Sequence, residues 1–143
     1  MQTIVEGVYW PDRRTKWARP MFLVSVSAGF PSPAEDYVEG RLDLNKHLIK
    51  HPVATFYVRV AGDSMIDAGI GPGSILIVDR AVEADDGDIV IARVNDELCV
   101  KRLRIADGCV WLMPENIDYE PLEVTEAMDF EVWGRVTHSI RAH

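Results

Sequence analysis

From residue 54 onward, apolar and polar residues alternate over short runs that are separated by turn residues. This pattern is typical of β-strands with one buried and one exposed face. The clearest runs are residues 55–60, 74–78, 89–94, 97–105, 109–113 and 130–136. The dipeptide Asp107-Gly108 between two of these runs favours a two-residue hairpin. About eight short strands joined by tight turns predict a small, partly closed β-barrel or folded sheet.

The first half-hundred residues lack this alternation. Residues 1–28 show no sustained period and are expected to form a flexible N-terminal arm. Residues 29–33, Gly-Phe-Pro-Ser-Pro, form a turn-rich linker. The organisation expected from the sequence is therefore an arm over residues 1–28 and a single domain over residues 29–143.

Two short helices are expected between the linker and the first strand. Ser32 and Glu35, with Pro33 at the first helical position, are a typical helix start and predict a helix over residues 33–40. A second helical turn is expected over residues 43–49, before Pro52. The expected fold class is mainly β, with one or two short helices.

The charge of the chain limits the partners that it can bind. Its 143 residues carry 15 Lys and Arg against 23 Asp and Glu, a net charge of −8. Direct sequence-specific DNA binding is not expected, because phosphate neutralisation needs clustered basic residues.

No run approaches the roughly 18 apolar residues of a membrane helix. A short apolar run over residues 21–29 resembles the end of a secretory signal, but it is too short and follows Pro20. We therefore expect protein partners, no membrane contact and a cytoplasmic location.

The cysteine and histidine residues indicate neither a disulfide framework nor a metal site. If Asp107-Gly108 closes a hairpin, Cys99 and Cys109 lie too far apart for a bridge, so both are expected to be reduced. The four histidines are scattered, with no Cys or acidic residues at metal-ligand spacing. No metal and no cofactor are expected.

Lys101 is a candidate catalytic residue because of its place in a strand. Alternation puts it on the same face as Cys99, Leu103 and Ile105, the face with apolar neighbours. A lysine that points inward loses hydration, and its pKa falls, so that a neutral amine becomes available as a general base. In the alternative, Lys101 lies at a strand edge with its ammonium group in water.

Ser64 is the candidate nucleophile. It lies in Ala61-Gly-Asp-Ser-Met65, where a strand ends and a glycine-rich loop begins. A sharp turn there exposes a hydroxyl and leaves the N–H groups of neighbouring residues to bind an oxyanion. A Ser–Lys pair is a known substitute for the Ser–His–Asp triad. Taken alone, this segment indicates only a structural turn.

Four motifs in register then identify a family resemblance. They are Ala28-Gly-Phe-Pro-Ser-Pro33, Gly62-Asp-Ser-Met-Ile66, Gly87-Asp-Ile-Val-Ile91 and Cys99-Val-Lys-Arg-Leu103. In order and spacing they resemble the UmuD/MucA-type self-cleaving proteins of the LexA-like Ser–Lys peptidase family. The resemblance covers the chain from Ala28 to about His138 and implies the LexA-type peptidase fold for the domain.

The resemblance assigns a role to each site residue. It implies that Lys101 takes the proton of Ser64, which attacks the carbonyl group of Ala28, so that the Ala28-Gly29 bond is hydrolysed and the arm is released. Gly62, Asp63 and Met65 would support the turn and its oxyanion-binding N–H groups. Cleavage within one chain and between two chains are both open.

The resemblance also implies partners. Proteins of this type are homodimers that are cleaved in the SOS response when RecA forms filaments on single-stranded DNA. The shortened form joins a UmuC-like Y-family polymerase in error-prone translesion synthesis. The first 27 residues do not closely match the expected arm, so the docking of this arm is not predicted.

Three other functions are compatible with parts of this sequence pattern. A signal peptidase uses the same Ser–Lys chemistry but needs a membrane anchor, and a LexA-like repressor needs a recognition helix; neither is found in the arm. The third is a binding module that keeps the fold without cleaving. Such a module would show no Ser64-dependent cut under any condition.

Overall fold

The computed structural model describes residues 2–12, 18–22 and 38–143. These residues fall into two compact units. One contains Met1–Pro11 and His51–His143, and the other contains Asp12–Lys50. Ala28 and Gly29 lie outside the described residues, as do residues 33–37 of the first expected helix.

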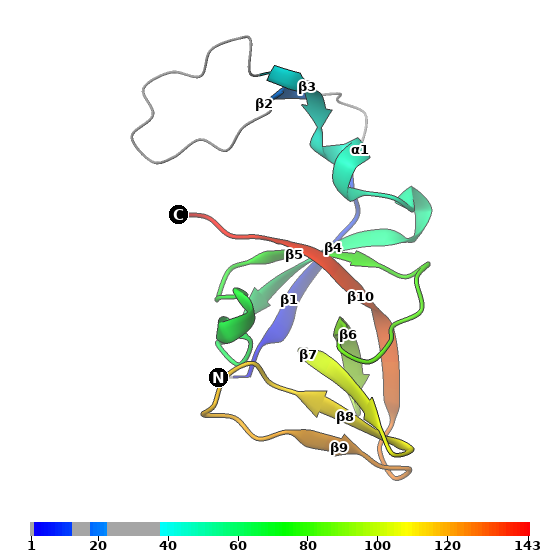
Figure 1. The fold of residues 1–143 in the computed structure, drawn as a ribbon. Coiled ribbons are helices and arrows are strands. Elements are labelled where there is room, and N and C mark those ends of the chain that lie inside the picture. Colours follow the sequence, from blue (N-terminus) through cyan, green and yellow to red (C-terminus); the bar gives the residue numbers. More distant parts are fainter. Residues whose placement is uncertain (1, 13–17, 23–37) are drawn as a thin grey trace. The chain divides into compact units, whose positions relative to one another are not determined.

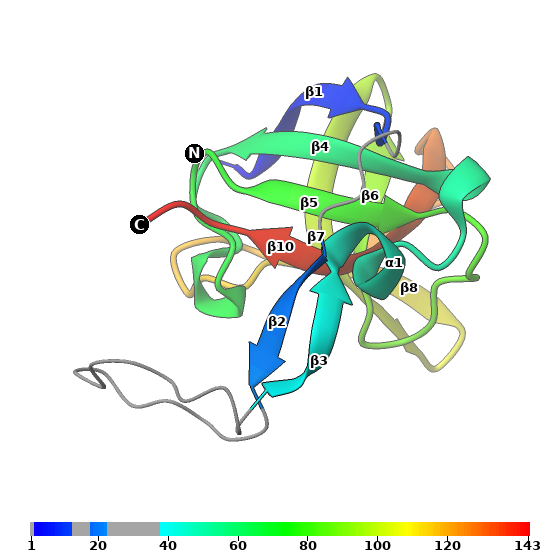
Figure 2. The ribbon, with the colours of Figure 1, turned by 90° about the horizontal axis from the view of Figure 1, so that it is seen from above.

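The first unit is built on a closed β-barrel (Figures 1 and 2). Its strands follow one another around the ring as β1 (Ile4–Tyr9), β4 (Thr55–Ala61), β5 (Ile75–Asp79), β10 (Phe130–Ile140), β6 (Ile89–Val94) and β7 (Glu97–Ala106). A pairing between β1 and β7 closes the ring. The sheet continues from β7 into β8 (Cys109–Met113) and β9 (Leu122–Val124). All pairings are antiparallel, as expected for strands that are joined mostly by short turns.

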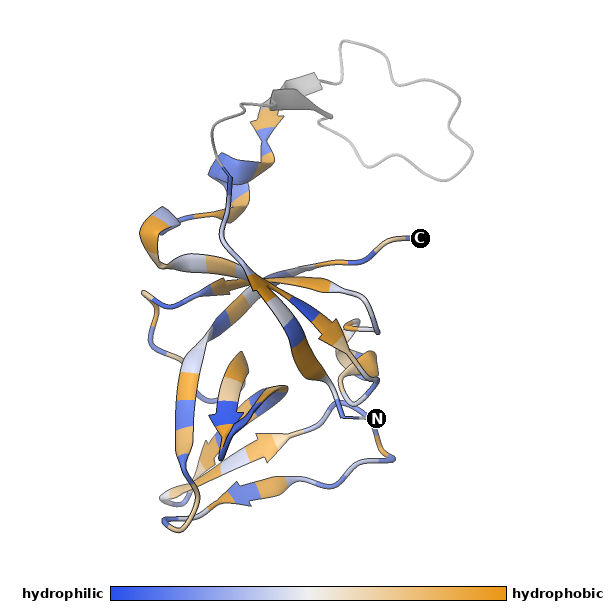
Figure 3. Cartoon of the chain, turned by 180° about the vertical axis from the view of Figure 1, so that it is seen from behind, coloured by the Kyte–Doolittle hydropathy of each residue, from blue (hydrophilic) through white to orange (hydrophobic). Residues whose placement is uncertain are grey.

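The alternation read from the sequence places the core residues. Phe56, Val58 and Val60 on β4 are buried, and hydrophobic and hydrophilic residues alternate along several strands in Figure 3. The barrel core contains Phe56, Val58, Val60, Met65, Ile70, Leu76, Val78, Ile91 and Val100. A second cluster of Val90, Ala92, Leu103 and Leu112 lies where β6, β7 and β8 pack together. Both faces of β7 are therefore covered near its centre.

The strands predicted from the sequence are confirmed. β6 and β8 have the predicted bounds, and the others differ by a few residues at their ends. Asp107 and Gly108 have φ values of 53° and 74°, the conformation that a two-residue turn of type I′ requires. The β1 and β9 strands were not predicted. Cys99 and Cys109 are free thiols, as expected.

The second unit pairs β2 (Ala18–Phe22) with β3 (Val38–Asp43), and α1 (Leu44–Leu48) follows. The helical turn expected over residues 43–49 is confirmed, and the Asp43 carboxylate caps it by accepting from the Asn45 N–H at 3.0 Å. The helix expected over residues 33–40 is wrong for residues 38–40, which belong to β3. Pairing with β2 satisfies their backbone, and this outweighs the local helix-start signal.

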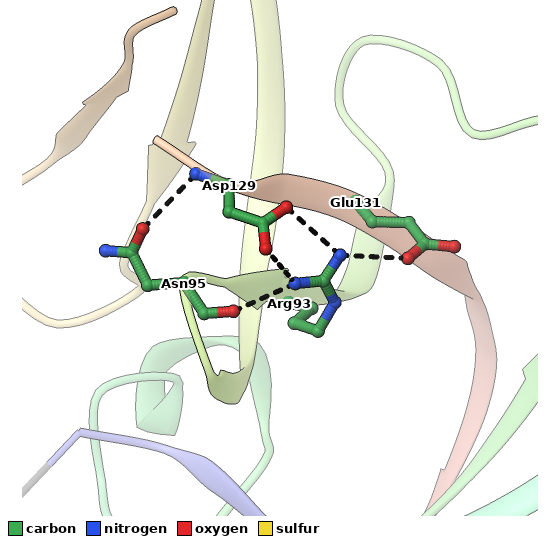
Figure 4. Close-up of polar contacts among 4 residues, drawn as sticks. All are labelled: Arg93, Asn95, Asp129 and Glu131. Carbon is green, nitrogen blue, oxygen red and sulfur yellow. Dashed lines mark hydrogen bonds and ion pairs between the residues drawn. The ribbon is translucent and has the colours of Figure 1, made fainter. Parts of the chain in front are cut away.

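A polar network joins two neighbouring strand ends (Figure 4). Arg93 on β6 binds the carboxylates of Asp129, at 2.7 and 3.2 Å, and Glu131, at 3.2 Å. Arg93 also donates to the Asn95 carbonyl, and the Asn95 side chain accepts from the Asp129 N–H. These contacts hold the β6–β7 turn against the start of β10. The paired carboxylates raise the pKa of Arg93.

Two 3₁₀ turns, Pro52–Ala54 and Ile66–Ala68, flank β4. Within the described ranges, no helix is long and apolar enough to cross a membrane. The same residues contain no group of three or more His, Cys, Asp or Glu side chains that could hold a metal ion. His51 instead binds the buried Asp79 carboxylate, at 2.5 Å.

Candidate functional site

Ser64 lies in a tight loop where β4 ends. Gly62 opens the loop with a φ of 85°, in the left-handed region that favours glycine. Met65, which follows the serine, is fully buried in the barrel core and anchors the loop. The Ser64 side chain is held in the interior at 0% exposure.

A second loop, residues 114–119, is hydrogen-bonded to the loop that carries Ser64. The Glu115 N–H donates to the Ser64 carbonyl at 2.8 Å, and the Glu115 carbonyl accepts from the Asp67 N–H at 2.8 Å. The Asn116 side-chain amide donates to the Asp63 carbonyl at 3.0 Å. The backbone on both sides of Ser64 is therefore fixed by residues about fifty positions later in the chain.

Tyr119 completes this contact. Its hydroxyl donates to the Asp63 carboxylate, and this hydrogen bond lowers the pKa of Asp63 and raises that of Tyr119. The Tyr119 ring lies 6.0 Å from Lys101 Nζ. Tyr119 thus contacts the loop that carries the serine and lies close to the lysine.

Lys101 lies near the middle of β7, opposite Val90 of β6. It is 7% exposed, as the alternation predicts, and the solvated strand-edge alternative does not hold. Its Nζ donates a hydrogen bond of 2.9 Å to Ser64 Oγ. Burial lowers the pKa of Lys101 below its ordinary value, because desolvation penalises the charged amine. Ile105, expected on the same buried face, is 43% exposed because it lies near the end of the strand.

The N-terminal residues reach the same place. The Thr3 N–H donates to Ser64 Oγ at 2.8 Å, and Lys101 Nζ donates to the Gln2 side-chain oxygen. Thr3 is completely buried. Two residues from the start of the chain therefore touch both members of the Ser–Lys pair.

A cavity of about 400 Å³ opens beside Lys101. Apolar residues from four segments line part of it: Val94, Cys99, Leu112, and Pro121 with Leu122. The rest of the lining is polar or charged: Gln2, Asn95, Glu97, Lys101 and Glu120. Burial raises the pKa of Cys99, so its thiol stays protonated at neutral pH. The cavity has the size to accept side chains of an extended peptide, and its lining offers both apolar and polar contacts.

The structure brings together five of the seven site residues named from the sequence. Ser64 and Lys101 are in hydrogen-bond contact, and Gly62, Asp63 and Met65 form the loop around the serine. Ala28 and Gly29 lie outside the described residues.

Sequence reasoning missed Gln2, Thr3, Asn116 and Tyr119. The sequence predicts only a loop around Asn116 and only an arm for the first residues. No local pattern marks either one, because each contributes through a contact with a distant segment.

A serine hydroxyl within hydrogen-bond distance of an amine of lowered pKa is an arrangement that can perform nucleophilic chemistry. The neutral amine accepts the hydroxyl proton as the oxygen attacks an electrophilic carbon. Exclusion of water around the pair keeps the amine neutral at a lower pH than in solution.

Comparison with known proteins identifies the family of the chain. Residues 20–137 match the family described as Peptidase S24-like. The chain is 42% identical over 125 residues to Protein MucA of Escherichia coli, covering 87% of this chain and 85% of that protein. It is 47% identical over 103 residues to Protein ImpA of Salmonella typhimurium, covering 72% of this chain and 71% of that protein.

A third relative is the LexA repressor of Dechloromonas aromatica, which is 43% identical over 118 residues. That match covers 82% of this chain and 58% of the repressor. The resemblance predicted from the four motifs is thereby confirmed, and the chain belongs to the Peptidase S24-like family, among relatives of the UmuD/MucA type.

Proposed function

We propose that this chain is a serine endopeptidase that cleaves its own Ala28-Gly29 bond with Ser64 as nucleophile and Lys101 as general base. The observation that carries the proposal is the 2.9 Å hydrogen bond between Lys101 Nζ and Ser64 Oγ in a buried site. Membership in a peptidase family gives the same reaction class.

In the proposed reaction, neutral Lys101 takes the proton of Ser64 as Oγ attacks the carbonyl carbon of Ala28. N–H groups of the Gly62–Met65 loop stabilise the negative charge on the carbonyl oxygen. Lys101 then donates its proton to the nitrogen of Gly29, and the peptide bond breaks. Water, deprotonated by Lys101, hydrolyses the ester between Ser64 and Ala28 and regenerates the serine.

Small residues suit the bond that is cut. Ala28 places only a methyl group beside the nucleophile, and Gly29 places no side chain against the loop. The cavity beside Lys101 is available to the side chains that precede Ala28. Loss of residues 1–28 would leave residues 29–143 as the product.

The biological role proposed is that of MucA-type proteins in the SOS response. Cleavage would be stimulated by a RecA filament on single-stranded DNA, in the cytoplasm. The shortened chain, as a homodimer, would act as an accessory subunit of a UmuC-like Y-family polymerase in error-prone translesion synthesis. The net charge of −8 supports protein partners rather than direct DNA contact.

The test is intact-mass spectrometry of the purified chain, incubated at neutral and strongly alkaline pH and with a RecA filament on single-stranded DNA. Two fragments that divide the chain between Ala28 and Gly29 are expected, and Ser64→Ala should give none. A chain that stays whole in every condition would contradict the proposal and favour a non-cleaving binding module. Fragments that persist in Ser64→Ala would exclude Ser64 as the nucleophile.

A further inference from the structure

The first residues of β1 lie where a peptide substrate has to bind. A peptide that Ser64 cuts must bring a backbone carbonyl carbon next to Ser64 Oγ. That oxygen already accepts a hydrogen bond from the backbone N–H of Thr3 at 2.8 Å. The N–H that makes this contact belongs to the Gln2-Thr3 peptide group, so one peptide unit of the chain itself occupies the place beside the nucleophile.

The backbone of this segment is held as a peptide ligand would be. The Thr3 carbonyl accepts a hydrogen bond of 3.1 Å from the Val100 N–H on β7, and Ile4 pairs with Cys99. On its other side, β1 pairs with β4, with Ile4 opposite Ala61. Addition of an extended strand between two sheet edges is a common mode of peptide recognition.

A side chain of this segment also contacts the catalytic pair. Lys101 Nζ donates to the Gln2 side-chain oxygen as well as to Ser64 Oγ. The general base of the proposed reaction must be free to accept the proton of Ser64. The segment thus obstructs the place of the substrate and engages the amine of the base in a second hydrogen bond.

We infer that residues 2–5 form an internal inhibitory segment, which occupies the peptide groove over Ser64 and Lys101 and must leave before the Ala28 segment can enter. This inference rests on the proposed function, because it assigns to Ser64 the role of nucleophile.

Two features make the release of this short segment feasible without loss of the barrel. The β1–β4 register shifts between Val5 and Gly7, so the residues beside Ser64 are separated from the ladder formed by Gly7, Val8 and Tyr9. The Thr3 hydroxyl is buried with no hydrogen-bond partner among the described residues, which weakens the binding of this end of the strand. The later part of β1 can therefore stay paired with β4 while residues 2–5 leave.

The test compares two lysine substitutions on the same strand. Thr3→Lys introduces a positive charge at a fully buried position that contacts Ser64 and Val100, and should expel the segment. Val8→Lys changes the net charge by the same amount at a position that is 40% exposed and distant along the strand. The cleavage rate without any activator is measured by intact mass, each time beside the same chain carrying Ser64→Ala.

Thr3→Lys should be cleaved at least tenfold faster than the unmodified chain, and Val8→Lys within twofold of it. Hydrogen–deuterium exchange, measured on chains that carry Ser64→Ala so that they stay intact, should show faster exchange over residues 2–5 in Thr3→Lys alone. A synthetic peptide of residues 1–9 added to Thr3→Lys should slow cleavage again, and a scrambled peptide should not.

The inhibitory role is overturned if Thr3→Lys folds and exchanges faster over residues 2–5 but is cleaved at the rate of the unmodified chain. That result would leave the proposed function intact. Absence of Ser64-dependent cleavage in every variant would overturn both. If Thr3→Lys does not fold, Gln2→Ala removes only the Lys101 contact and should raise the rate at least threefold. An unchanged rate in Gln2→Ala would then overturn the inference.

Discussion

The Thr3 N–H donates a hydrogen bond of 2.8 Å to Ser64 Oγ, across 61 positions of the sequence. The same oxygen accepts from Lys101 Nζ at 2.9 Å, across a further 37 positions. Three segments that are far apart in the chain thus meet at one atom. The reactivity of Ser64 therefore depends on which donors and acceptors surround that oxygen at a given moment.

Lys101→Ala is expected to abolish self-cleavage and keep the fold. Loss of the general base should lower the cleavage rate by about 100-fold or more. The free energy of unfolding should change by less than about 2 kcal/mol, because removal of a costly buried amine offsets the contacts that its side chain loses. Cleavage is followed by intact mass, and stability by urea denaturation.

Arg104→Ala is the matched control, because it removes an exposed basic side chain from the same strand. It should leave cleavage unchanged. A Lys101→Ala chain that fails to fold would show that Lys101 serves the structure, and one that still cuts would exclude it as the base.

Cleavage should become faster as pH rises. Burial lowers the pKa of Lys101 below 10.5, and the neutral amine is the reactive form. The rate should rise about tenfold per pH unit below that pKa, then level off at a pH lower than 10.5. A rate that is independent of pH between 7 and 10 would contradict this assignment.

The pH dependence of the free energy of unfolding should also reflect the titration of Lys101. Between the lowered pKa and 10.5, Lys101 is protonated in the unfolded chain and neutral in the folded one, so the unfolded chain binds more protons. The free energy of unfolding of the unmodified chain, relative to Lys101→Ala, should therefore rise with pH across this interval. Urea denaturation of both chains at several pH values measures it, and a difference that falls with pH would contradict the prediction.

Gly29→Lys is expected to block self-cleavage while Ser64 stays reactive. A long charged side chain directly after the cut bond would crowd the tight loop around the nucleophile. Intact-mass spectrometry should show an uncut chain. The control Glu35→Lys, which places the same side chain a few residues beyond the bond, should be cut normally. Normal processing of Gly29→Lys would place the cut bond elsewhere.

Asn116→Ala tests whether the loop of residues 114–119 positions the nucleophile. It removes the hydrogen bond to the Asp63 carbonyl, next to Ser64, and should slow cleavage by roughly tenfold. The melting temperature should change little, because Asn116 lies outside the core. Asn116→Asp keeps an oxygen but loses the donor, so it should be equally slow. A normal rate in either variant would show that this contact does not position the serine.

Gly134→Ala is expected to destabilise the barrel. A Cβ atom there would lie 2.7 Å from the buried Val78 side chain and 3.1 Å from the Asp79 carbonyl. Overpacking of this kind costs about 1–3 kcal/mol. In the control Gly7→Ala, the new Cβ atom meets only the end of the exposed Tyr9 side chain, which can move aside. Urea denaturation should show a loss in Gly134→Ala that clearly exceeds that in Gly7→Ala.

The strands that the sequence predicted well are those with a local cause. Ile89–Val94 and Cys109–Met113 alternate with the period of a strand and are bounded by turn residues, and both were predicted with their observed bounds. The hairpin at Asp107-Gly108 was predicted because those residues tolerate positive φ values.

The elements that were missed depend on a partner strand. β1 contains Gly7 and a register shift, so its alternation is interrupted, and it becomes a strand by pairing with β4 and β7. Residues 38–40 follow a helix-start signal, yet they pair with β2. In both cases backbone hydrogen bonds to a distant segment determine the conformation, and no local pattern reports them.

By itself, the sequence determined the strand-rich fold, the family motifs and the identity of Ser64 and Lys101 as candidate residues, because these follow from local periodicity and from residue types at fixed spacing. Only the tertiary structure decided that the two side chains touch, that Lys101 is desolvated, and that Gln2 and Thr3 occupy the place beside them. Contact and burial arise when distant segments pack together, and the free energy of that packing belongs to the whole barrel rather than to any one segment.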